Sequence, residues 1–329
     1  MTSPRRNVLI TSAGRRTSLV VHFQRAAHRH DAQVIAADSD PLAPALLVAD
    51  EAARLPLIAT SRYFDALTEL VTGREVGLLI PTIDTELQFL AEHRDQLAAL
   101  GCLAAVSSPG LVSATGDKWL MRELFRGSGV ALPRAWLPGP RHAVGGDQIP
   151  AQVFVKPRRG SAGVGAQSVA REHLGSVVAS LVDPIIEEIL EGLEVTVDAL
   201  LGLDGTVLHY VPRLRLKTIG GESVEGVTIG HEPLASWLEA VFDRCRTYGA
   251  RGPITVQLFL TERGPVLSEI NPRFGGGFPL AAAAGADYAE MLLRIADGES
   301  VAPSIGSYEV GLYMTRFYSE KFLTRKLWP

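Results

Sequence analysis

The segment Gly264-Pro-Val-Leu-Ser-Glu-Ile-Asn-Pro-Arg-Phe-Gly-Gly-Gly277 is the most informative part of this sequence. Residues 266–271 are predicted to form a strand that Pro272 ends. Side chains two apart on a strand point the same way, so Glu269 and Asn271 present a carboxylate and an amide oxygen side by side. Oxygen ligands of this kind suit Mg2+. Two such residues by themselves more often form a solvated strand face, so a metal-binding role depends on what the rest of the chain supplies.

Composition restricts the class of protein. The chain has 329 residues, a net charge of −4 and a pI near 6.1, so a nucleic-acid partner is not expected. Its length suits two or three domains of ~100–200 residues each. No apolar run approaches ~18 residues, so neither a membrane span nor a membrane partner is predicted. Cys102 and Cys245 lie far apart, which predicts neither a disulfide framework nor a zinc site and fits the cytoplasm.

The first hundred residues alternate short apolar strands with helical patterns, which predicts a Rossmann-like parallel α/β sheet. The expected strands are 8–11, 34–37 and 77–80, and the expected helices are 17–28, 63–72 and 85–100. Asp38 ends the second strand, where dinucleotide-binding domains place a ribose carboxylate. The first strand-to-helix turn, 11–16, has one glycine where that fingerprint has three, so NAD binding is disfavoured.

The remainder of the chain has an α+β pattern. A boundary is expected near 107–113, and 133–150 is expected to be irregular because it is rich in Pro and Gly. The expected strands are 152–155, 185–190, 194–201, 207–214 and 254–260, of which the last two should pair in antiparallel fashion. The expected helices are 119–126, 237–248 and 281–296.

Two lysines stand where a phosphate could bind. Lys156 ends a strand and is followed by a glycine-rich loop whose backbone N–H groups could approach anionic oxygens. A lysine there is a point charge for phosphate, although the loop alone could equally be a hairpin turn. Lys118 lies at a helix start, where a cation is unfavourable unless an anion is bound. Considered alone, Lys118 is better explained as an exposed lysine.

Two further segments carry polar patterns. The connector 188–192 has backbone groups that could read an adenine edge, and Glu194 after it could accept hydrogen bonds from ribose hydroxyls. The alternative is a hairpin with solvated glutamates. Strand alternation places Arg213, Arg215 and Lys217 on one face, which favours an anionic substrate over a solvated charged face. Weaker substrate candidates are Arg15, Arg16 and the segment 82–86.

Together these segments, from Val8 to about Ala296, resemble the ATP-grasp superfamily and, within it, a single synthetase unit of the carbamoyl-phosphate synthetase large subunit. The resemblance implies a Rossmann-like pre-ATP-grasp domain at 1–112. It implies an ATP-grasp domain at 113–305, composed of a lid at about 130–187 and an antiparallel-sheet core, and a C-terminal extension at 306–329.

The resemblance also implies site residues. For ATP these are Lys118, Lys156, Gly160, Ser161, Gly163, Gly165, Glu188, Leu190 and Glu194. For two Mg2+ ions, with Mn2+ as an alternative, they are Gln257, Glu269 and Asn271. For the substrate they are Arg213, Arg215, Lys217, Gly275 and Gly276, and the implied catalytic residues are Arg273, Lys156 and Arg215.

The implied activity is ATP-dependent formation of an amide bond through an acyl phosphate. The substrates would be a small amine and an amino acid or other small carboxylic acid, and a homodimer is an open alternative to a monomer. Residues 275–277 look more like those of the related amino-acid ligases than those of the synthetase. Two other readings stay open: phosphorylation of bicarbonate or carbamate, and a non-catalytic ATP-binding module.

Overall fold

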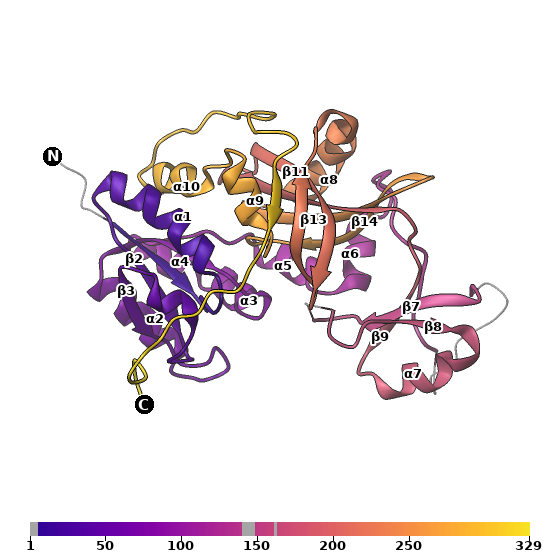
Figure 1. The fold of residues 1–329 in the computed structure, drawn as a ribbon, viewed down its shortest axis with the longest axis horizontal. Helices are drawn as coiled ribbons and strands as arrows, with labels where there is room; N and C mark the ends of the chain where they lie inside the picture. Colours follow the sequence, from indigo (N-terminus) through magenta and orange to yellow (C-terminus); the bar gives the residue numbers. More distant parts are fainter. Residues whose placement is uncertain (1–5, 140–148, 161–162) are drawn as a thin grey trace.

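The computed structural model describes residues 6–139, 149–160 and 163–329. Three β-sheets follow one another along the molecule (Figure 1). The sheet formed first in the chain lies at one end, a small four-stranded sheet lies at the other, and a six-stranded sheet lies between them. The expected combination of α/β and α+β parts is therefore confirmed.

The N-terminal sheet is parallel, with strand order β3-β2-β1-β4-β5. Its strands are β1 (Asn7–Thr11), β2 (Val34–Asp38), β3 (Glu51–Arg54), β4 (Val76–Pro81) and β5 (Leu103–Ala104). The Asp38 carboxylate accepts hydrogen bonds from the N–H groups of Gly14 at 2.8 Å and Asp40 at 2.9 Å, which holds the turn after β1.

Helices cover both faces of this sheet because its strands are apolar on both sides. They are α1 (Thr17–Ala27), α2 (Tyr63–Gly73), α3 (Asp84–Glu92) and α4 (Arg94–Ala99), with 3-10 turns η1 (His28–His30) and η2 (Pro44–Leu47). The prediction of one helix over 85–100 is wrong. His93 leaves the helical backbone at φ −100° and ψ 7°, and its ring stacks on Phe89.

The central sheet is antiparallel, with strand order β14-β13-β10-β11-β12-β15. Its strands are β10 (Leu193–Leu201), β11 (Val207–Ile219), β12 (Glu222–Thr228), β13 (Gly252–Thr261), β14 (Gly264–Asn271) and β15 (Tyr313–Thr315). The expected pairing of β11 with β13 is wrong, because β10 lies between them. β10 is almost entirely buried, which suits a central position.

Helices pack on the central sheet as well, and those described are α5 (Pro109–Thr115), α6 (Lys118–Leu124), α8 (Ala235–Thr247) and α9 (Phe278–Ala283), with a 3-10 turn η5 (Glu232–Leu234). Helix α10 (Tyr288–Ala296) packs against α1 and the N-terminal core. The single helix expected over 281–296 is wrong. Gly285 has a φ of +115°, and the Asp287 carboxylate then caps α10 by accepting from the Glu290 N–H at 3.3 Å. Helix α5 also occupies the expected boundary at 107–113, so the division at residue 112 remains a proposal.

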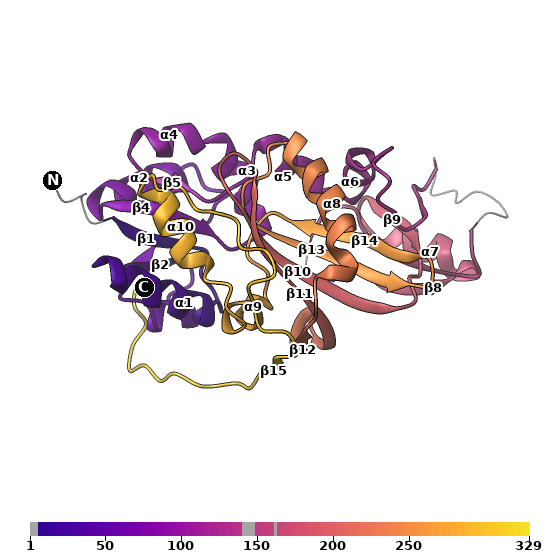
Figure 2. The ribbon, with the colours of Figure 1, turned by 90° about the horizontal axis from the view of Figure 1, so that it is seen from above.

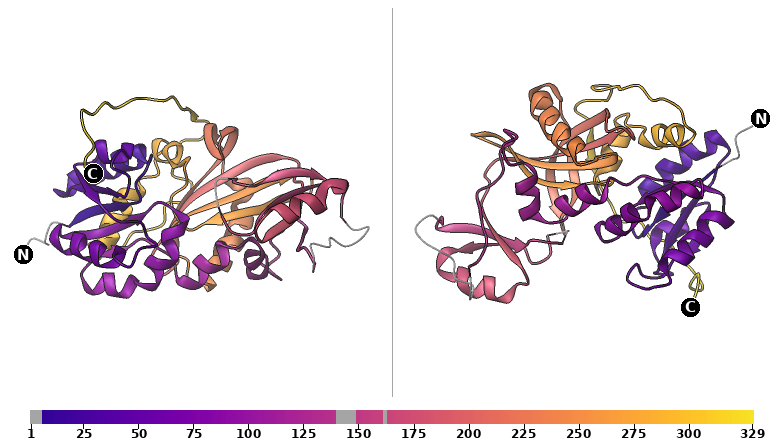
Figure 3. Two further views of the ribbon diagram at one scale, coloured as in Figure 1. Left: turned by 90° about the horizontal axis from the view of Figure 1, so that it is seen from below. Right: turned by 180° about the vertical axis from the view of Figure 1, so that it is seen from behind.

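The small sheet has the order β6-β9-β7-β8 and lies apart from the N-terminal sheet (Figure 3). It comprises β6 (Ala135–Trp136), β7 (Gln152–Pro157), β8 (Gln167–Ala170) and β9 (Pro184–Glu188), with η4 (Arg171–His173) and α7 (Leu174–Ser180). Strand β6 falls within a segment that was expected to be irregular. The strands of this sheet fall between residues 135 and 188, which is nearly the range of 130–187 proposed for the lid.

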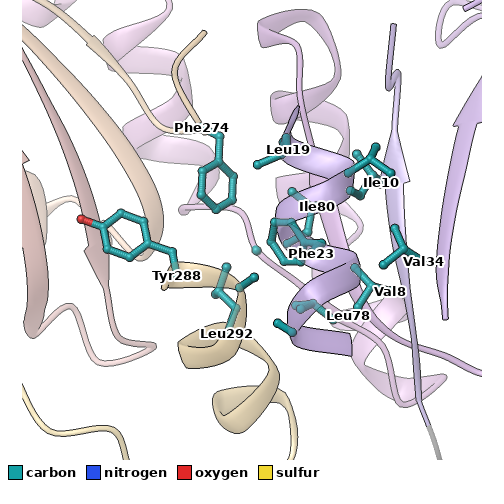
Figure 4. Close-up of a cluster of buried hydrophobic side chains, with 14 of the residues drawn as sticks. Val8, Ile10, Leu19, Phe23, Val34, Leu78, Ile80, Phe274, Tyr288 and Leu292 are labelled. Atoms are coloured by element: carbon teal, nitrogen blue, oxygen red, sulfur yellow. The ribbon is translucent and has the colours of Figure 1, made fainter. Parts of the chain in front are cut away.

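Residues from the second half of the chain complete the N-terminal core. Phe274 lies next to Phe23 of α1, and Tyr288 belongs to the same buried cluster (Figure 4). The rings of Phe23 and Phe274 meet edge to face with centroids 5.7 Å apart. These contacts fix the turn after β14 relative to the turn after β1, and both turns contribute to the site described below.

The C-terminal segment returns to the N-terminal sheet (Figure 2). β15 pairs with β12 in antiparallel fashion, and further on the indole of Trp328 donates to the Ser39 carbonyl at 3.4 Å. Among the described residues no helix has the length and apolarity needed to cross a lipid bilayer.

Candidate active site

A cleft of about 470 Å3 lies where the three sheets meet. Most of the site residues expected from the sequence line it: Lys118, Lys156, Gly160, Gly163, Glu194, Arg213, Arg215, Gln257, Glu269, Asn271, Arg273, Gly275 and Gly276. Four others, Gly165, Glu188, Leu190 and Lys217, do not line it, and Ser161 lies outside the described residues.

The oxygen ligands expected on β14 share one face with an amide from β13. Gln257 lies directly opposite Glu269 in the antiparallel register, and Asn271 follows two residues later on the same side. A β-bulge at this point also places Ser268 in the cleft, which strand alternation did not predict. The Glu269 carboxylate is half-buried and has no hydrogen bond or ion pair with any described residue.

Lys156 and Lys118 lie at the side of the cleft nearest the small sheet. Lys156 forms a buried ion pair with Glu187, with Nζ and Oε2 2.7 Å apart. Lys118 donates to the Gly160 carbonyl at 3.1 Å, so it touches the glycine-rich loop. Burial lowers the pKa of Lys118, while the charge of Glu269 opposes that shift. Sequence reasoning did not assign Glu187, although its position in an otherwise apolar strand was a usable signal.

Glu194, at the start of β10, holds Arg215 through an ion pair. Arg215 Nη1 also lies 3.4 Å from Gln257 Oε1. Arg215 therefore lies between the expected ribose carboxylate and the expected metal ligands.

Glu188 has a structural role in these contacts. Its carboxylate accepts from Arg134 Nε at 2.9 Å and from Arg263 at 2.8 Å, and these two partners and the Arg134 N–H lower its pKa against the effect of burial. The Glu188 N–H donates to the Arg134 carbonyl at 2.9 Å. That N–H is therefore occupied, and adenine recognition by 188–190 remains a prediction for the other backbone groups.

Lys217 lies on the wrong face for the expected substrate cluster. Arg215 is opposite Gly226 and Lys217 is opposite Glu225, because a β-bulge adds one residue between them. Neighbouring residues of β12 point to opposite faces, so Arg215 and Lys217 do as well. Lys217 instead lies 3.5 Å from the Glu225 carboxylate, half-exposed. The expectation of three cations on one face is therefore wrong.

Arg273 carries two hydrogen bonds to Asp84, at 2.7 Å each. Asp84 begins α3 in the N-terminal part, so this bidentate pair joins the two halves of the chain at the cleft. Arg273 Nη2 also lies 3.4 Å from Asn271 Oδ1, beside the expected metal ligands. The sequence marked 82–86 only as a weak candidate, because nothing in it paired Asp84 with Arg273.

Two glycines of the triplet pack against a buried ion pair. Arg213 Nε donates to Asp198 at 2.7 Å, and both side chains are almost fully buried. A Cβ at Gly275 would lie 2.9 Å from the Asp198 carboxylate, and one at Gly277 would lie 2.3 Å from Arg213 Nη2. Gly275 and Gly277 therefore lie so close to the ion pair that a side chain at either position would collide with it.

We expect Gly277→Ala to reduce the free energy of unfolding by about 1–3 kcal/mol, because the new methyl group overlaps a guanidinium that Asp198 holds in place. Gly276→Ala is the matched control, since its Cβ would come no closer than 3.4 Å to a neighbouring side chain or backbone atom. Chemical denaturation of both variants measures the difference. Equal losses would contradict this account of the triplet.

A buried carboxylate supports the two N-terminal turns beneath the cleft. Glu86 is fully buried and accepts from the Thr82 N–H at 2.9 Å and from Ser12 Oγ at 2.9 Å. Ser12 has a φ of +47°, which is uncommon for a residue other than glycine. Burial raises the pKa of Glu86 above its ordinary value of 4.5, against the opposing effect of these hydrogen bonds.

This shift has a defined sign. A pKa raised by folding means that the stability contribution of protonated Glu86 is complete below about 4.5 and is lost as pH rises through the folded-state value. We therefore expect wild type to lose stability relative to Glu86→Gln as pH rises above 4.5 and through the raised pKa of Glu86. Thermal unfolding of both proteins across this range tests it. A difference in Tm that does not change with pH would contradict it.

Comparisons with known proteins agree with this geometry. Residues 8–105 match the family described as "PylC-like, N-terminal domain", and residues 180–315 match "ATP-grasp in the biosynthetic pathway with Ter operon". The D-alanine–D-alanine ligase of Corynebacterium urealyticum is 28% identical over 220 residues, which are 57% of this chain and 60% of that enzyme. The chain thus spans less than two thirds of that relative.

Two solved structures share the fold. The biotin carboxylase domain of Hydrogenobacter thermophilus 2-oxoglutarate carboxylase has a TM-score of 0.73 at 16% identity, over 93% of this chain and 73% of that one. The L-amino acid ligase of Bacillus licheniformis has a TM-score of 0.69 at 17% identity, over 91% and 77%.

The fold and these matches define an ATP-grasp protein. More particularly, residues 8–105 are similar to PylC-like N-terminal domains, and residues 180–315 are similar to the ATP-grasp domain described for the Ter operon. The narrower resemblance to a carbamoyl-phosphate synthetase unit stays a prediction.

Proposed function

We propose that this protein is an ATP-dependent carboxylate–amine ligase that forms an amide bond through an acyl phosphate. The observation that carries the proposal is the convergence of two lysines, a glycine-rich loop and a face of oxygen ligands in one cleft with an arginine-rich end. Similar proteins named as D-alanine–D-alanine ligase and L-amino acid ligase support an amino acid or other small acid as substrate.

The nucleotide end of the cleft would hold ATP through charge and backbone groups. Lys156 and Lys118 would meet its phosphates, and Gly160 and Gly163 line the same cleft. Glu194 would accept hydrogen bonds from the ribose. Each lysine would exchange a protein contact for phosphate oxygen, Glu187 in the case of Lys156 and the Gly160 carbonyl in the case of Lys118.

The residues present fit Mg2+. Glu269 is an unpaired carboxylate on the same face as the side-chain oxygens of Gln257 and Asn271, and Mg2+ commonly uses one or two carboxylates together with substrate phosphates. The described residues include no group of three or more His, Cys, Asp or Glu side chains that could hold a metal ion, so phosphate oxygens would complete the coordination. When bound, the ion supplies neutralisation of phosphate charge.

The chemistry then needs positioning and charge neutralisation. A carboxylate oxygen of the acid attacks the γ-phosphorus, and the bond from that phosphorus to the bridging oxygen of ADP breaks. The amine nitrogen next attacks the acyl carbon, phosphate leaves, and the nitrogen loses a proton to solvent or a base. Arg273, Lys156 and Arg215 would offset the charge that develops on the transferred group.

The test is acid- and amine-dependent release of ADP and phosphate from ATP with Mg2+, with mass detection of the product. Panels of D- and L-amino acids should yield an amide with matched release of ADP and phosphate. Release that requires bicarbonate and forms no amide would favour the carbamoyl-phosphate-like alternative. ATP binding without substrate-dependent turnover would favour a non-catalytic module.

A further inference from the structure

Arg16 is a cation without a carboxylate partner in the wall of the cleft. It lies in the turn between β1 and α1 and faces the glycine triplet, where a Cβ on Gly276 would be 3.4 Å from Arg16 Nη1. Within the described part of the chain, its side chain makes one hydrogen bond, to the Thr82 carbonyl at 3.5 Å. No ion pair of Arg16 occurs among those residues.

The carboxylates around Arg16 already have other partners. Arg273 holds Asp84 at 2.7 Å, and Arg213 holds Asp198 at 2.7 Å. Glu222 contacts Arg15 at 3.1 Å and Arg316, on the C-terminal segment, at 3.6 Å.

Arg16 is therefore an excess positive charge in a half-buried place. Burial, followed by the charge of Arg273, lowers the pKa of Arg16 to about 10 against the opposing charges of Glu222 and Asp84, so an anion placed directly beside it would be stabilised.

A second unsatisfied donor lies on the same glycine triplet. Arg213 Nη1 is buried and has no hydrogen-bond partner among the described residues. Arg213 Nη1 lies directly against Gly277, and Arg16 Nη1 lies against Gly276. Buried donors are rarely left unpaired in folded proteins, so such a group calls for a ligand or an ordered water. Arg16 and Arg213 therefore offer their free donors along two consecutive residues of the triplet.

We propose that Arg16 and the free Nη1 of Arg213 form a subsite for a carboxylate that is not phosphorylated, so that one of the two substrates carries an additional carboxylate. The inference rests on the proposed ligase function and specifies its substrate class. The reacting carboxylate must lie by the oxygen ligands of β13 and β14. In the described part of the chain no hydrogen bond joins Arg16 to those ligands, and Arg16 lies against the triplet at Gly276.

The additional carboxylate could belong to the acid or to the amine, and paired probes separate these sources. Succinate against butyrate tests the acid, because the two differ in the second carboxylate. Glycine and D-alanine against glycinamide and D-alaninamide test the amine in the same way. Binding is measured by calorimetry in the presence of Mg2+ and a non-hydrolysable ATP analogue, and turnover is measured as ADP release. We expect the probe with the additional carboxylate to be preferred in one of the two series.

Arg16→Gln should weaken that preferred probe by roughly 10–100-fold in Kd and KM, the loss typical of a hydrogen bond to a charged group, and should leave the KM for ATP unchanged. Arg16→Lys should recover part of the affinity. Arg25→Gln is the matched control, because it removes the same charge from an exposed residue of α1 that lies outside the cleft lining.

Equal affinity of Arg16→Gln and wild type for the preferred probe would overturn the subsite, as would the absence of any preference in both series. Either result alongside normal amide formation leaves the ligase function intact. If the carboxylate probes bind through Arg16 but no acid supports release of ADP, the ligase function fails and the subsite stands.

Discussion

Glu269→Gln should lower kcat by roughly 100-fold or more at saturating ATP, because it removes the only carboxylate from the proposed set of metal ligands. Glu269 has no protein partner among the described residues, so no internal ion pair or hydrogen bond is lost and the free energy of unfolding should change little. The measurement is ADP release as a function of Mg2+ concentration, together with thermal unfolding of the protein.

Glu262→Gln is a suitable control for this variant. It makes the same chemical change in the same hairpin, at an exposed residue between β13 and β14. We expect it to keep the kcat and the Mg2+ dependence of wild type. Near-normal turnover of Glu269→Gln at low Mg2+ would remove Glu269 from the metal site and leave the remaining assignments to be tested separately.

Lys156→Met should also reduce kcat/KM for ATP by roughly 100-fold or more, since a buried cation that meets phosphate would be gone. This variant should lose stability as well. Glu187 would be left buried without its counter-ion, and breaking a buried pair costs about 3–5 kcal/mol. Loss of activity in the single variant could therefore reflect partial unfolding.

The double variant Lys156→Met/Glu187→Gln separates these effects. It removes both charges, so we expect the free energy of unfolding to return towards the wild-type value while turnover remains low. Chemical denaturation and ADP release are measured on the same samples. If the double variant is stable and regains turnover, Lys156 has only a structural role as the partner of Glu187.

Much of the nucleotide end could be predicted because its signals are local. Glu269 and Asn271 share a face by strand alternation, and Lys156 precedes its glycine loop directly in sequence. These relations extend over a few residues and depend on backbone geometry alone. The parallel sheet was predictable for the same reason, since strand and helix periods differ within short windows.

Predictions failed where one extra or displaced residue interrupts the alternation of a strand or the periodicity of a helix. The bulge between Arg215 and Lys217 reverses the face of Lys217, and His93 interrupts a pattern that could be one helix. A bulge is set by the partner strand and by packing, so alternation along a single strand cannot reveal it.

The sequence by itself determined which residue types line this part of the cleft and which elements carry them, because those features follow from backbone periodicity and from residues close together in the chain. Only the tertiary structure determined which acidic residue pairs with which basic residue. Asp84 pairs with Arg273, 189 positions away in sequence, and Glu187 pairs with Lys156 on a neighbouring strand. Charge pairing depends on distance in space. Among the described residues, only the structure shows that Asp84, Asp198 and Glu222 pair with other arginines and that Arg16 forms no ion pair.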